Sequence, residues 1–376
     1  MKKVLIVTTI STTVTAFLIP HIKLLENMGF QVEIATKIIG DERKFRSILK
    51  GYEVYNLPFS RSVKSLENVK AYKQMKKLIS ETDYNFIHVH TPIASFLTRL
   101  ASKKNTKVIY TAHGFHFNEN GSFVTNTVFK LAEKIGALKT DKLIVINKDD
   151  YKSGGEIISP TKLRYIKGVG VDMHQYNLQV IDLEAKLKLK KELGIKEDSK
   201  IITHIAEFND NKRQLDIVLA AKELIKKYGD KFVVLLVGTG KMLGDIKNKI
   251  KELGLDHNVK CLGFRNDVNQ ILSITNVGLL VSLREGLPKS VMEMMAMKVP
   301  VVLTNIRGNR DLVENSKNGF LVDVKSPQQI AECCYSILTN SKLAENFKES
   351  SYKKMLEEYS LEKILHELKQ VYSDMQ

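Results

Sequence analysis

Two glutamates eight residues apart provide the clearest candidates for chemistry. Glu285 lies in the loop that follows an apolar run predicting a buried strand, and Glu293 lies in the helix predicted to start near Pro288. Carboxylates accept hydrogen bonds from hydroxyl groups, and the backbone N–H groups at a helix start bind anions such as a diphosphate. The order carboxylate, helix start, carboxylate matches the order sugar, diphosphate, ribose in a nucleotide sugar. The spacing alone is equally typical of a solvated loop acid followed by a helix-surface acid.

The residues between the two glutamates suit an anion-binding turn. Gly286 allows a tight turn, and Pro288 suits the first turn of a helix, where its missing N–H costs nothing. The predicted contacts to the ligand therefore also include Leu287 and Ser290.

Short apolar runs alternate with helical stretches along the whole chain, which predicts parallel sheets covered by helices. Two successive series indicate an α/β protein with two doubly wound, Rossmann-like domains whose sheets face each other across a crevice. We expect a first domain over residues 1–170 and a second over 171–358, with a helix at about 359–376 packing back on the first. The predicted strands are 4–8, 32–36, 86–90, 107–111 and 142–146, then 201–206, 232–237, 259–262, 277–282 and 299–303.

The charge of the 376 residues is unevenly distributed. The net charge is +16, and residues 1–170 hold 27 Lys and Arg against 14 Asp and Glu, a net +13. This asymmetry predicts an anionic partner for the first domain: nucleic acid, a phospholipid surface or a phosphorylated substrate. The three cysteines lack metal-type spacing and indicate a reducing cytoplasm. The sequence has no run of about 18 apolar residues, so we expect no membrane span.

The densest basic segment, residues 61–77, predicts an amphipathic helix. Its apolar residues recur at three- and four-residue steps, which is one stripe of a helix. Two interpretations remain open: a surface helix that packs its stripe on a sheet, or an element that binds a membrane surface. The stripe is Leu66, Val69, Tyr72, Met75 and Ile79, and the flanking cations are Lys70, Lys73, Lys76 and Lys77.

Several motifs together resemble the family 4 retaining glycosyltransferases, which have the GT-B fold. The segment 282–296 resembles the family's E-x7-E signature, and the resemblance extends over nearly the whole chain through the segments 89–92, 111–117, 168–172, 299–302 and 318–322. Within the family, the sequence is most similar to bacterial enzymes that build capsular or extracellular polysaccharide on a polyprenyl carrier.

The resemblance implies roles for individual residues. It implies that Glu285 contacts the hydroxyls of the donor sugar and that Glu293 holds the ribose diol. His113 matches the histidine that reaches the donor sugar. For His116 two roles stay open, as a residue that supports the contacting side chains or as an acceptor-side residue. Lys212 matches the cation that binds the donor diphosphate, where a fixed positive charge stabilises the departing nucleotide.

The sequence departs from the family pattern at two places. Glu207 stands where many members have an arginine, so Arg213 is the candidate for the second cation. The segment 9–13, rich in threonine and serine, replaces a glycine pair that approaches phosphate or acceptor. For the nucleotide base, the loops that carry Gly238 and the pair Phe264-Arg265 resemble those that flank it in the family, although such loops are also common as plain turns.

The expected activity is a metal-independent transfer, with retention, of a sugar from a nucleotide donor, with UDP as the expected nucleotide. The expected acceptor is a polyprenyl-diphosphate-linked glycan at the inner face of the cell membrane, where the basic first domain would meet anionic lipid. We expect no cofactor and no metal ion, and no nucleic-acid partner. Two alternatives stay open: a nucleotide-sugar 2-epimerase of the same fold, and a basic nucleic-acid-binding protein.

Overall fold

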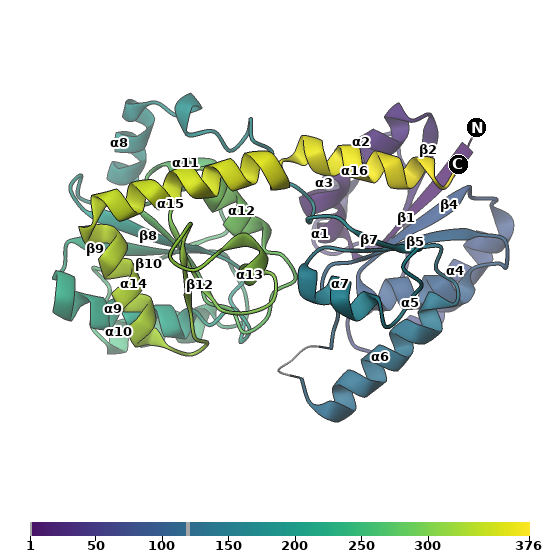
Figure 1. Cartoon of the computed structure of the whole chain (residues 1–376), viewed down its shortest axis with the longest axis horizontal. Helices are drawn as coiled ribbons and strands as arrows, with labels where there is room; N and C mark the ends of the chain where they lie inside the picture. The colour runs from purple at the N-terminus through teal and green to yellow at the C-terminus, as the bar shows by residue number, and fades with distance from the viewer. Residues whose placement is uncertain (1, 118–120) are drawn as a thin grey trace. The chain divides into compact units, whose positions relative to one another are not determined.

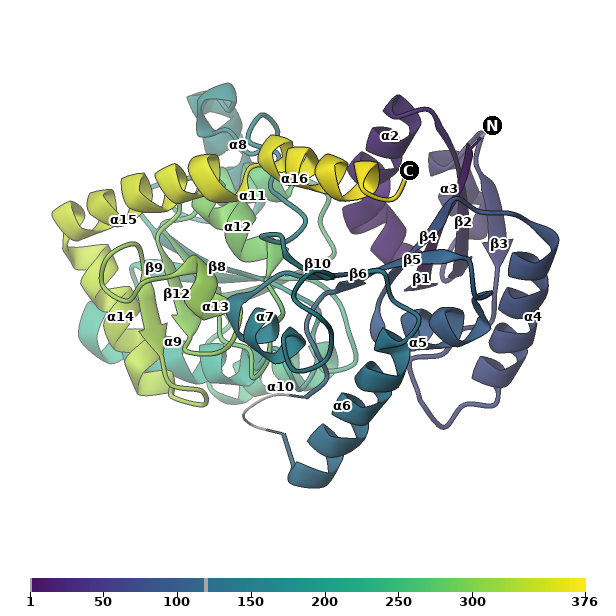
Figure 2. The ribbon, with the colours of Figure 1, turned by 45° about the vertical axis from the view of Figure 1, so that its right-hand side comes forward.

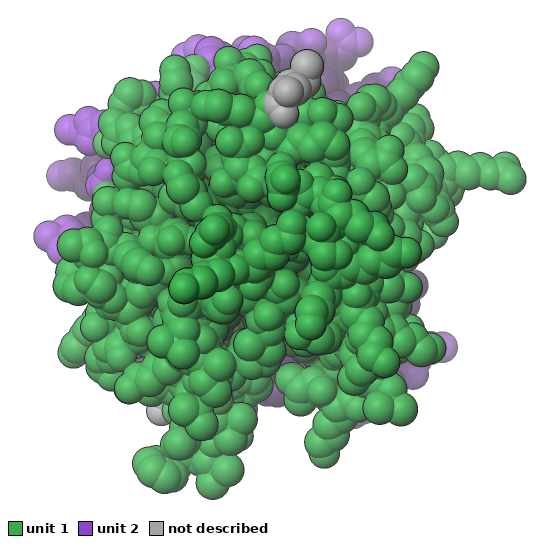
Figure 3. Space-filling model, turned by 90° about the vertical axis from the view of Figure 1, so that its right-hand side faces the viewer, with its two compact units in different colours: residues 1–169, 362–376 green, residues 170–361 purple. Residues whose placement is uncertain are grey.

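The computed structural model describes residues 2–117 and 121–376. The chain divides into two compact units, one formed by Met1–Val169 with Glu362–Gln376 and the other by Gly170–Leu361, as coloured in Figure 3. Each unit contains a parallel sheet covered by helices, which confirms the predicted fold class. The chain passes from the first unit to the second between Val169 and Gly170, and the last helix belongs to the first unit.

The sheet of the first unit has the strand order β3-β2-β1-β4-β5-β6-β7. Every neighbouring pair is parallel, so all carboxyl ends of the strands meet at one edge. The strands are β1 (Lys2–Ile10), β2 (Phe30–Lys37), β3 (Glu53–Asn56), β4 (Phe86–His90), β5 (Lys107–Ala112), β6 (Lys142–Val145) and β7 (Leu163–Tyr165).

Alternate residues of β1 serve two separate cores. Leu5 and Val7 pack in one hydrophobic cluster, whereas Val4 and Ile6 pack in another, because successive side chains of a strand point to opposite faces. Helices α4 and α5 contribute to the first cluster, and α2, α3 and α16 to the second (Figure 1). The helices are α1 (Ser11–Thr13), η1 (Val14–Leu18), α2 (Ile19–Asn27), α3 (Glu42–Ile48), α4 (Glu67–Glu81), α5 (Pro92–Ala101), α6 (Phe123–Ala137), α7 (Lys148–Gly154) and α16 (Leu361–Ser373).

The second unit repeats this architecture with the strand order β10-β9-β8-β11-β12-β13, again wholly parallel. Its strands are β8 (Lys200–Ile205), β9 (Phe232–Val237), β10 (Val259–Gly263), β11 (Val277–Leu280), β12 (Val301–Thr304) and β13 (Phe320–Val322). Its helices are η2 (Leu178–Val180), α8 (Leu183–Glu192), α9 (Gln214–Tyr228), α10 (Leu243–Glu252), α11 (Val268–Ser273), α12 (Lys289–Ala296), α13 (Asn309–Leu312), α14 (Pro327–Thr339), α15 (Ser341–Lys354) and η3 (Met355–Tyr359).

All ten predicted strands are present, with bounds shifted by at most two residues. Three further strands, β3, β7 and β13, were not predicted. Each pairs with only one neighbour at the edge of its sheet and is three or four residues long, so it lacks the long apolar run of a central strand.

The predicted stripe of the basic helix is wrong at its amino-terminal end. Helix α4 starts at Glu67, and Leu66 and Val69 are exposed, at 79% and 52%. The buried face instead runs through Asn68, Ala71, Met75 and Ile79. Asn68 is buried because its side chain bonds the backbone of Ser60 and Ser62, and this holds the preceding loop onto the helix.

None of the helices in the described residues has the length and apolar composition needed to cross a bilayer.

Candidate active site

The candidate site of the second unit lies at the topological switch point of its sheet, where the strand order reverses between β8 and β11. Strands β8 and β11 are neighbours, with β9 and β10 added on one side and β12 and β13 on the other. In open parallel sheets, ligands bind outside the carboxyl ends of the strands at such a switch point. The loop after β8 carries Lys212, and the loop after β11 carries Glu285.

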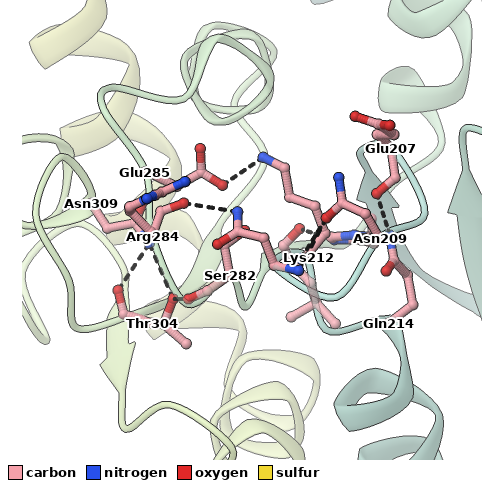
Figure 4. Close-up of polar contacts among 12 residues, drawn as sticks. Glu207, Asn209, Lys212, Gln214, Ser282, Arg284, Glu285, Thr304 and Asn309 are labelled. Atoms are coloured by element: carbon pink, nitrogen blue, oxygen red, sulfur yellow. Dashed lines mark hydrogen bonds and ion pairs between the residues drawn. The ribbon is translucent and has the colours of Figure 1, made fainter. Parts of the chain in front are cut away.

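These two loops bind each other directly (Figure 4). Lys212 Nζ lies 2.5 Å from Glu285 Oε1, and both side chains are largely buried. Two further hydrogen bonds join the loops: the Asn211 side chain donates through Nδ2 to the Arg284 carbonyl at 3.0 Å, and Leu283 N donates to the Asn211 carbonyl at 2.8 Å. The predicted sugar-contacting carboxylate and the predicted diphosphate cation are thus brought together at the switch point.

A third loop, which follows β12, packs against the loop that carries Glu285. Gly308 has φ +78°, and a Cβ built on it would lie 2.2 Å from the Gly286 carbonyl oxygen. Arg307 Nε donates to the Glu285 carbonyl at 3.3 Å, and Thr304 Oγ1 donates to the Ser282 carbonyl at 2.6 Å. The sequence analysis missed Arg307, because its hydrogen bond to Glu285 joins residues that are far apart along the chain.

The glycines after β9 are required for close backbone approach. A Cβ on Gly238 would lie 2.1 Å from the Ala206 carbonyl oxygen, and one on Gly240 would lie 2.3 Å from the Phe208 carbonyl oxygen. Phe208 N also donates to the Thr239 carbonyl at 2.8 Å. These glycines therefore fix the course of the loop that leads to Lys212.

Glu293 lies in the middle of α12 and is only 7% exposed. Its Oε1 accepts a hydrogen bond from Tyr176 Oη at 2.8 Å and lies 3.2 Å from Lys289 Nζ. Oε2 has no hydrogen-bond partner among the described residues. Burial and the Glu293 carboxylate raise the pKa of Tyr176, so its phenol stays protonated and donates. Tyr176 was missed by the sequence analysis because it lies 117 residues away along the chain.

Helix α12 begins directly after Pro288. Pro288 occupies the N-cap, one position before the first helical residue, and the first bond within the helix is donated by Val291 N to the Pro288 carbonyl. The backbone N–H groups of Lys289 and Ser290 precede that bond and face out of the helix start. Leu287 and Gly286 form the connection back to Glu285.

The side chains of two arginines that were predicted to bind the donor each pair with an aspartate nearby in the sequence. The Arg213 guanidinium donates two hydrogen bonds to Asp216, at 2.9 and 2.7 Å, and Arg265 binds Asp267 in the same bidentate way, at 2.8 and 2.5 Å. In each case the carboxylate raises the pKa of the guanidinium. The structure therefore does not place the Arg213 side chain with Lys212 and Glu285.

The remaining predicted residues of this unit lie on neighbouring loops. The Glu207 side chain is exposed, and its backbone carbonyl accepts a hydrogen bond from Gln214 at 2.9 Å. Phe264 is 71% exposed and follows Gly263, whose carbonyl accepts from Gly238 N at 2.8 Å. The two predicted base-flanking loops are thus joined to each other.

In the first unit, His113 directly follows β5 and belongs to a chain of histidines. Its Nε2 lies 3.1 Å from His90 Nδ1, and the His90 ring lies 4.1 Å from the His88 ring. His88 in turn bonds Tyr372 of α16 at 2.9 Å and Thr111 at 2.8 Å. The position of His113 therefore depends on the final helix of the chain.

The imidazoles of His88, His90 and His113 are uncharged at neutral pH. His113 is partly exposed at its surface, yet the surrounding protein lowers its pKa to about 4 through burial. Burial, followed by the charges of neighbouring histidines, also lowers the pKa of His88 and His90 well below the usual value. His113 is thus a hydrogen-bonding group rather than a cation.

The threonine-rich segment 9–13 forms the end of β1 and the start of a helix rather than a loop. Thr9 Oγ1 bonds Thr91 Oγ1 at 2.7 Å, and Ser11 Oγ accepts a hydrogen bond from Ile39 N at 3.0 Å. Two of its hydroxyls are therefore used inside the unit. Thr12 is exposed.

Among the residues that the structure describes, no group of three or more His, Cys, Asp or Glu side chains is arranged to hold a metal ion.

Comparison with known proteins decides the family. The model of the glycosyl transferases group 1 matches residues 185–354, and a glycosyl transferase 4-like model matches residues 3–147. The putative glycosyltransferase EpsD of Bacillus subtilis is 30% identical over 99% of this chain and 96% of its own length. The chain belongs to the family 4 glycosyltransferases of the GT-B type. A UDP-Gal:alpha-D-GlcNAc-diphosphoundecaprenol alpha-1,3-galactosyltransferase of Escherichia coli is 26% identical over 84% of the chain and 82% of the relative.

Solved structures confirm the fold of this glycosyltransferase. HepE of Anabaena, crystallised with UDP and glucose, is 18% identical, covers 100% of both chains and superposes with a TM-score of 0.81. WaaG, described as a glycosyltransferase involved in lipopolysaccharide biosynthesis, is 14% identical and covers 98% of this chain and 99% of its own, with a TM-score of 0.77.

The lowered pKa of His113 predicts an acid-sensitive fold. Between pH 6.5 and about 4 the unfolded chain binds a proton at this residue that the folded chain does not, so stability is lost as the pH falls through that window. His113→Gln keeps an amide near the His90 contact and removes the titration, so it should abolish up to about 3 kcal/mol of the acid-dependent loss. Thermal unfolding midpoints of both proteins, measured from pH 7 to pH 4.5, test this; equal slopes would contradict it.

The close approach at Gly308 predicts a second effect on stability. Gly308→Ala places a methyl group against the Gly286 carbonyl in addition to the cost of positive φ, which is about 1–2 kcal/mol. Gly29→Ala is the matched control, because Gly29 has φ +85° and no atom within 4 Å of a built Cβ. We expect the Gly308 variant to unfold at a clearly lower temperature than the Gly29 variant. Similar melting of the two variants would refute a steric requirement.

Proposed function

We propose that this glycosyltransferase transfers a sugar from a UDP-sugar to a polyprenyl-diphosphate-linked glycan, with retention of configuration, in the synthesis of a bacterial polysaccharide. The observation that carries the proposal is the Lys212–Glu285 pair beside the start of α12, at the switch point of the second sheet.

The arrangement around α12 supports a nucleotide-sugar donor. Glu285 is an acceptor held in place by a cation, so it can orient the hydroxyls of the sugar. Glu293 keeps Oε2 for the ribose diol, because Tyr176 and Lys289 both contact Oε1. The HepE complex with UDP and glucose and the UDP-Gal-dependent relative support UDP as the nucleotide.

Positive charge supplied by the protein favours departure of the nucleotide. The leaving diphosphate gains negative charge, and Lys212 with the N–H groups at the start of α12 stabilises that charge where it develops. No metal ion is needed in this scheme. Attack of the acceptor from the face that the nucleotide leaves gives retention, and no side chain is assigned as a covalent nucleophile.

His113 completes the proposed donor contacts as a neutral hydrogen-bonding group to the sugar. The acceptor class follows the diphosphoundecaprenol-linked substrate in the name of the E. coli relative. Such a carrier lies in the membrane, so we place the enzyme in the cytoplasm, peripherally bound to the inner face of the cell membrane, through the basic first unit. Neither a 2-epimerase nor a nucleic-acid-binding protein is favoured by the family or the relatives.

Loss of the diphosphate cation should slow transfer. A charge-assisted hydrogen bond contributes about 1.5–3 kcal/mol, so Lys212→Ala should reduce kcat/KM by about 10- to 150-fold. Transfer from radiolabelled UDP-sugars to a synthetic polyprenyl-diphosphate sugar measures this. Lys222→Ala is the matched control, because Lys222 is exposed on α9 of the same unit and should leave the rate unchanged. Full activity of the Lys212 variant would refute the assigned role.

The proposed source of positive charge also predicts the response to chelators. Turnover of the purified enzyme should be the same in excess EDTA and in excess Mg²⁺, because Lys212 and the α12 start supply the charge. Loss of activity in EDTA that Mg²⁺ restores would contradict the metal-independent scheme.

A further inference from the structure

Helix α6 of the first unit presents an apolar stripe to solvent. Residues at four- and three-residue steps share one face of a helix, and here the apolar residues on that face are exposed. Figure 2 shows α6 extending from the lower side of the first unit. Phe123, at the first turn, is 86% exposed, and Leu138, at the C-cap, is 83% exposed. Contiguous exposed apolar patches of this kind mark interaction sites in monomeric proteins. The stripe consists of Phe123, Val124, Val128, Leu131, Ile135 and Leu138.

The opposite, buried face of α6 is held by a polar anchor. Glu133 Oε2 lies 2.9 Å from Arg99 Nη2 of α5, and Tyr110 Oη donates to Glu133 Oε1 at 3.1 Å. Arg99 is only 1% exposed, and Gly136 packs so closely on it that a built Cβ would lie 2.5 Å from the guanidinium carbon. The inward face therefore combines this ion pair with Phe129 and Ala137, which pack on the hydrophobic core, while a second apolar stripe faces outward.

Cations outnumber carboxylates along α6, and the carboxylate of Glu156 from outside the helix forms an ion pair with Lys130. Glu133 is the only acidic residue between positions 122 and 139, and it is used in the buried anchor. The same segment carries Lys130, Lys134 and Lys139. An apolar stripe flanked by cations is complementary to a bilayer with anionic headgroups.

A second apolar and basic segment adjoins α6 across a cavity of about 300 Å³. The residues that line the cavity include Arg61, Lys64, Ile93, His116 and Phe129 of α6. Arg61 and Lys64 form no ion pair with any residue in the described part of the chain. Ile93 follows β4 and His116 follows β5, so the cavity lies at the carboxyl edge of the sheet, the edge that carries His113.

We propose that the α6 stripe and the exposed loop at 61–66 together form the surface by which this enzyme binds an anionic lipid bilayer. The stripe enters the headgroup region, and Arg61 and Lys64 meet lipid phosphates at the mouth of the cavity. A second copy of the chain fits this surface less well, because residues 1–170 carry a net charge of +13 and two such faces repel each other. This inference rests on the proposed function, because membrane binding through this surface brings the carboxyl edge of the first sheet close to an acceptor that is carried by a lipid.

The test is co-sedimentation of the full chain with phosphatidylcholine vesicles and with vesicles that also contain phosphatidylglycerol. The triple variant Val128→Ser/Leu131→Ser/Ile135→Ser should bind the anionic vesicles at least about tenfold more weakly than the original chain. Arg61→Gln/Lys64→Gln should weaken binding by about fivefold for each cation and remove the preference for phosphatidylglycerol. The matched control is Val180→Ser/Leu183→Ser, because both residues are similarly exposed in the second unit; it should bind as the original chain does.

Three outcomes would overturn the inference. These are a lack of vesicle binding by the original chain, unchanged binding by the triple variant, and a dimer of the original chain that the triple variant dissociates in sedimentation velocity. Hydrolysis of UDP-sugar by the same variants in vesicle-free buffer separates this inference from the proposed function. Normal hydrolysis with lost vesicle binding supports the surface, whereas vesicle binding without any reaction of UDP-sugars refutes only the proposed function.

Discussion

The ion pair between Lys212 and Glu285 joins two loops whose residues are 73 positions apart, and the candidate site of the second unit is built around it. Both side chains have lost most of their contact with water, so each charge needs the other or an equivalent ligand. The pair also fixes where the loops after β8 and β11 stand at the switch point. The glycines at 238, 240 and 308 serve this arrangement, because each admits a neighbouring backbone where a Cβ would collide.

In the first unit, the main constraint is the position of the neutral His113 side chain. His113 is bonded to His90, which stacks on His88, which bonds Tyr372 of the last helix. Burial keeps these rings uncharged, since an ionised imidazole in that environment would lack water. The carboxyl-terminal helix is therefore part of the framework of a residue more than 250 positions earlier in the chain.

In two helices of the same unit, the apolar periodicity of the sequence does not indicate which face is buried. In α4 the stripe that begins at Leu66 suggests a packed face, but Asn68 is buried through its bonds to the preceding loop, and Leu66 and Val69 turn outward. In α6 the apolar stripe is also real, yet the buried side is decided by Glu133 and Arg99. With Glu133 and Arg99 on the buried face, the apolar stripe lies on the exposed face.

The sequence by itself determined the alternation of strands and helices, the two series of strands and the family, because long β-branched runs and local motifs such as residues 282–296 are properties of neighbouring residues. It also identified Lys212, Glu285, Glu293 and His113 as candidates through motif resemblance. Only the tertiary structure decided which of these side chains meet and which partners hold them. Tyr176, Arg307 and Tyr372 act through contacts across many residues of chain, and Arg213 is occupied by Asp216, so no local pattern distinguishes them. Such contacts depend on how strands are ordered within each sheet, and that order is set by packing rather than by spacing along the chain.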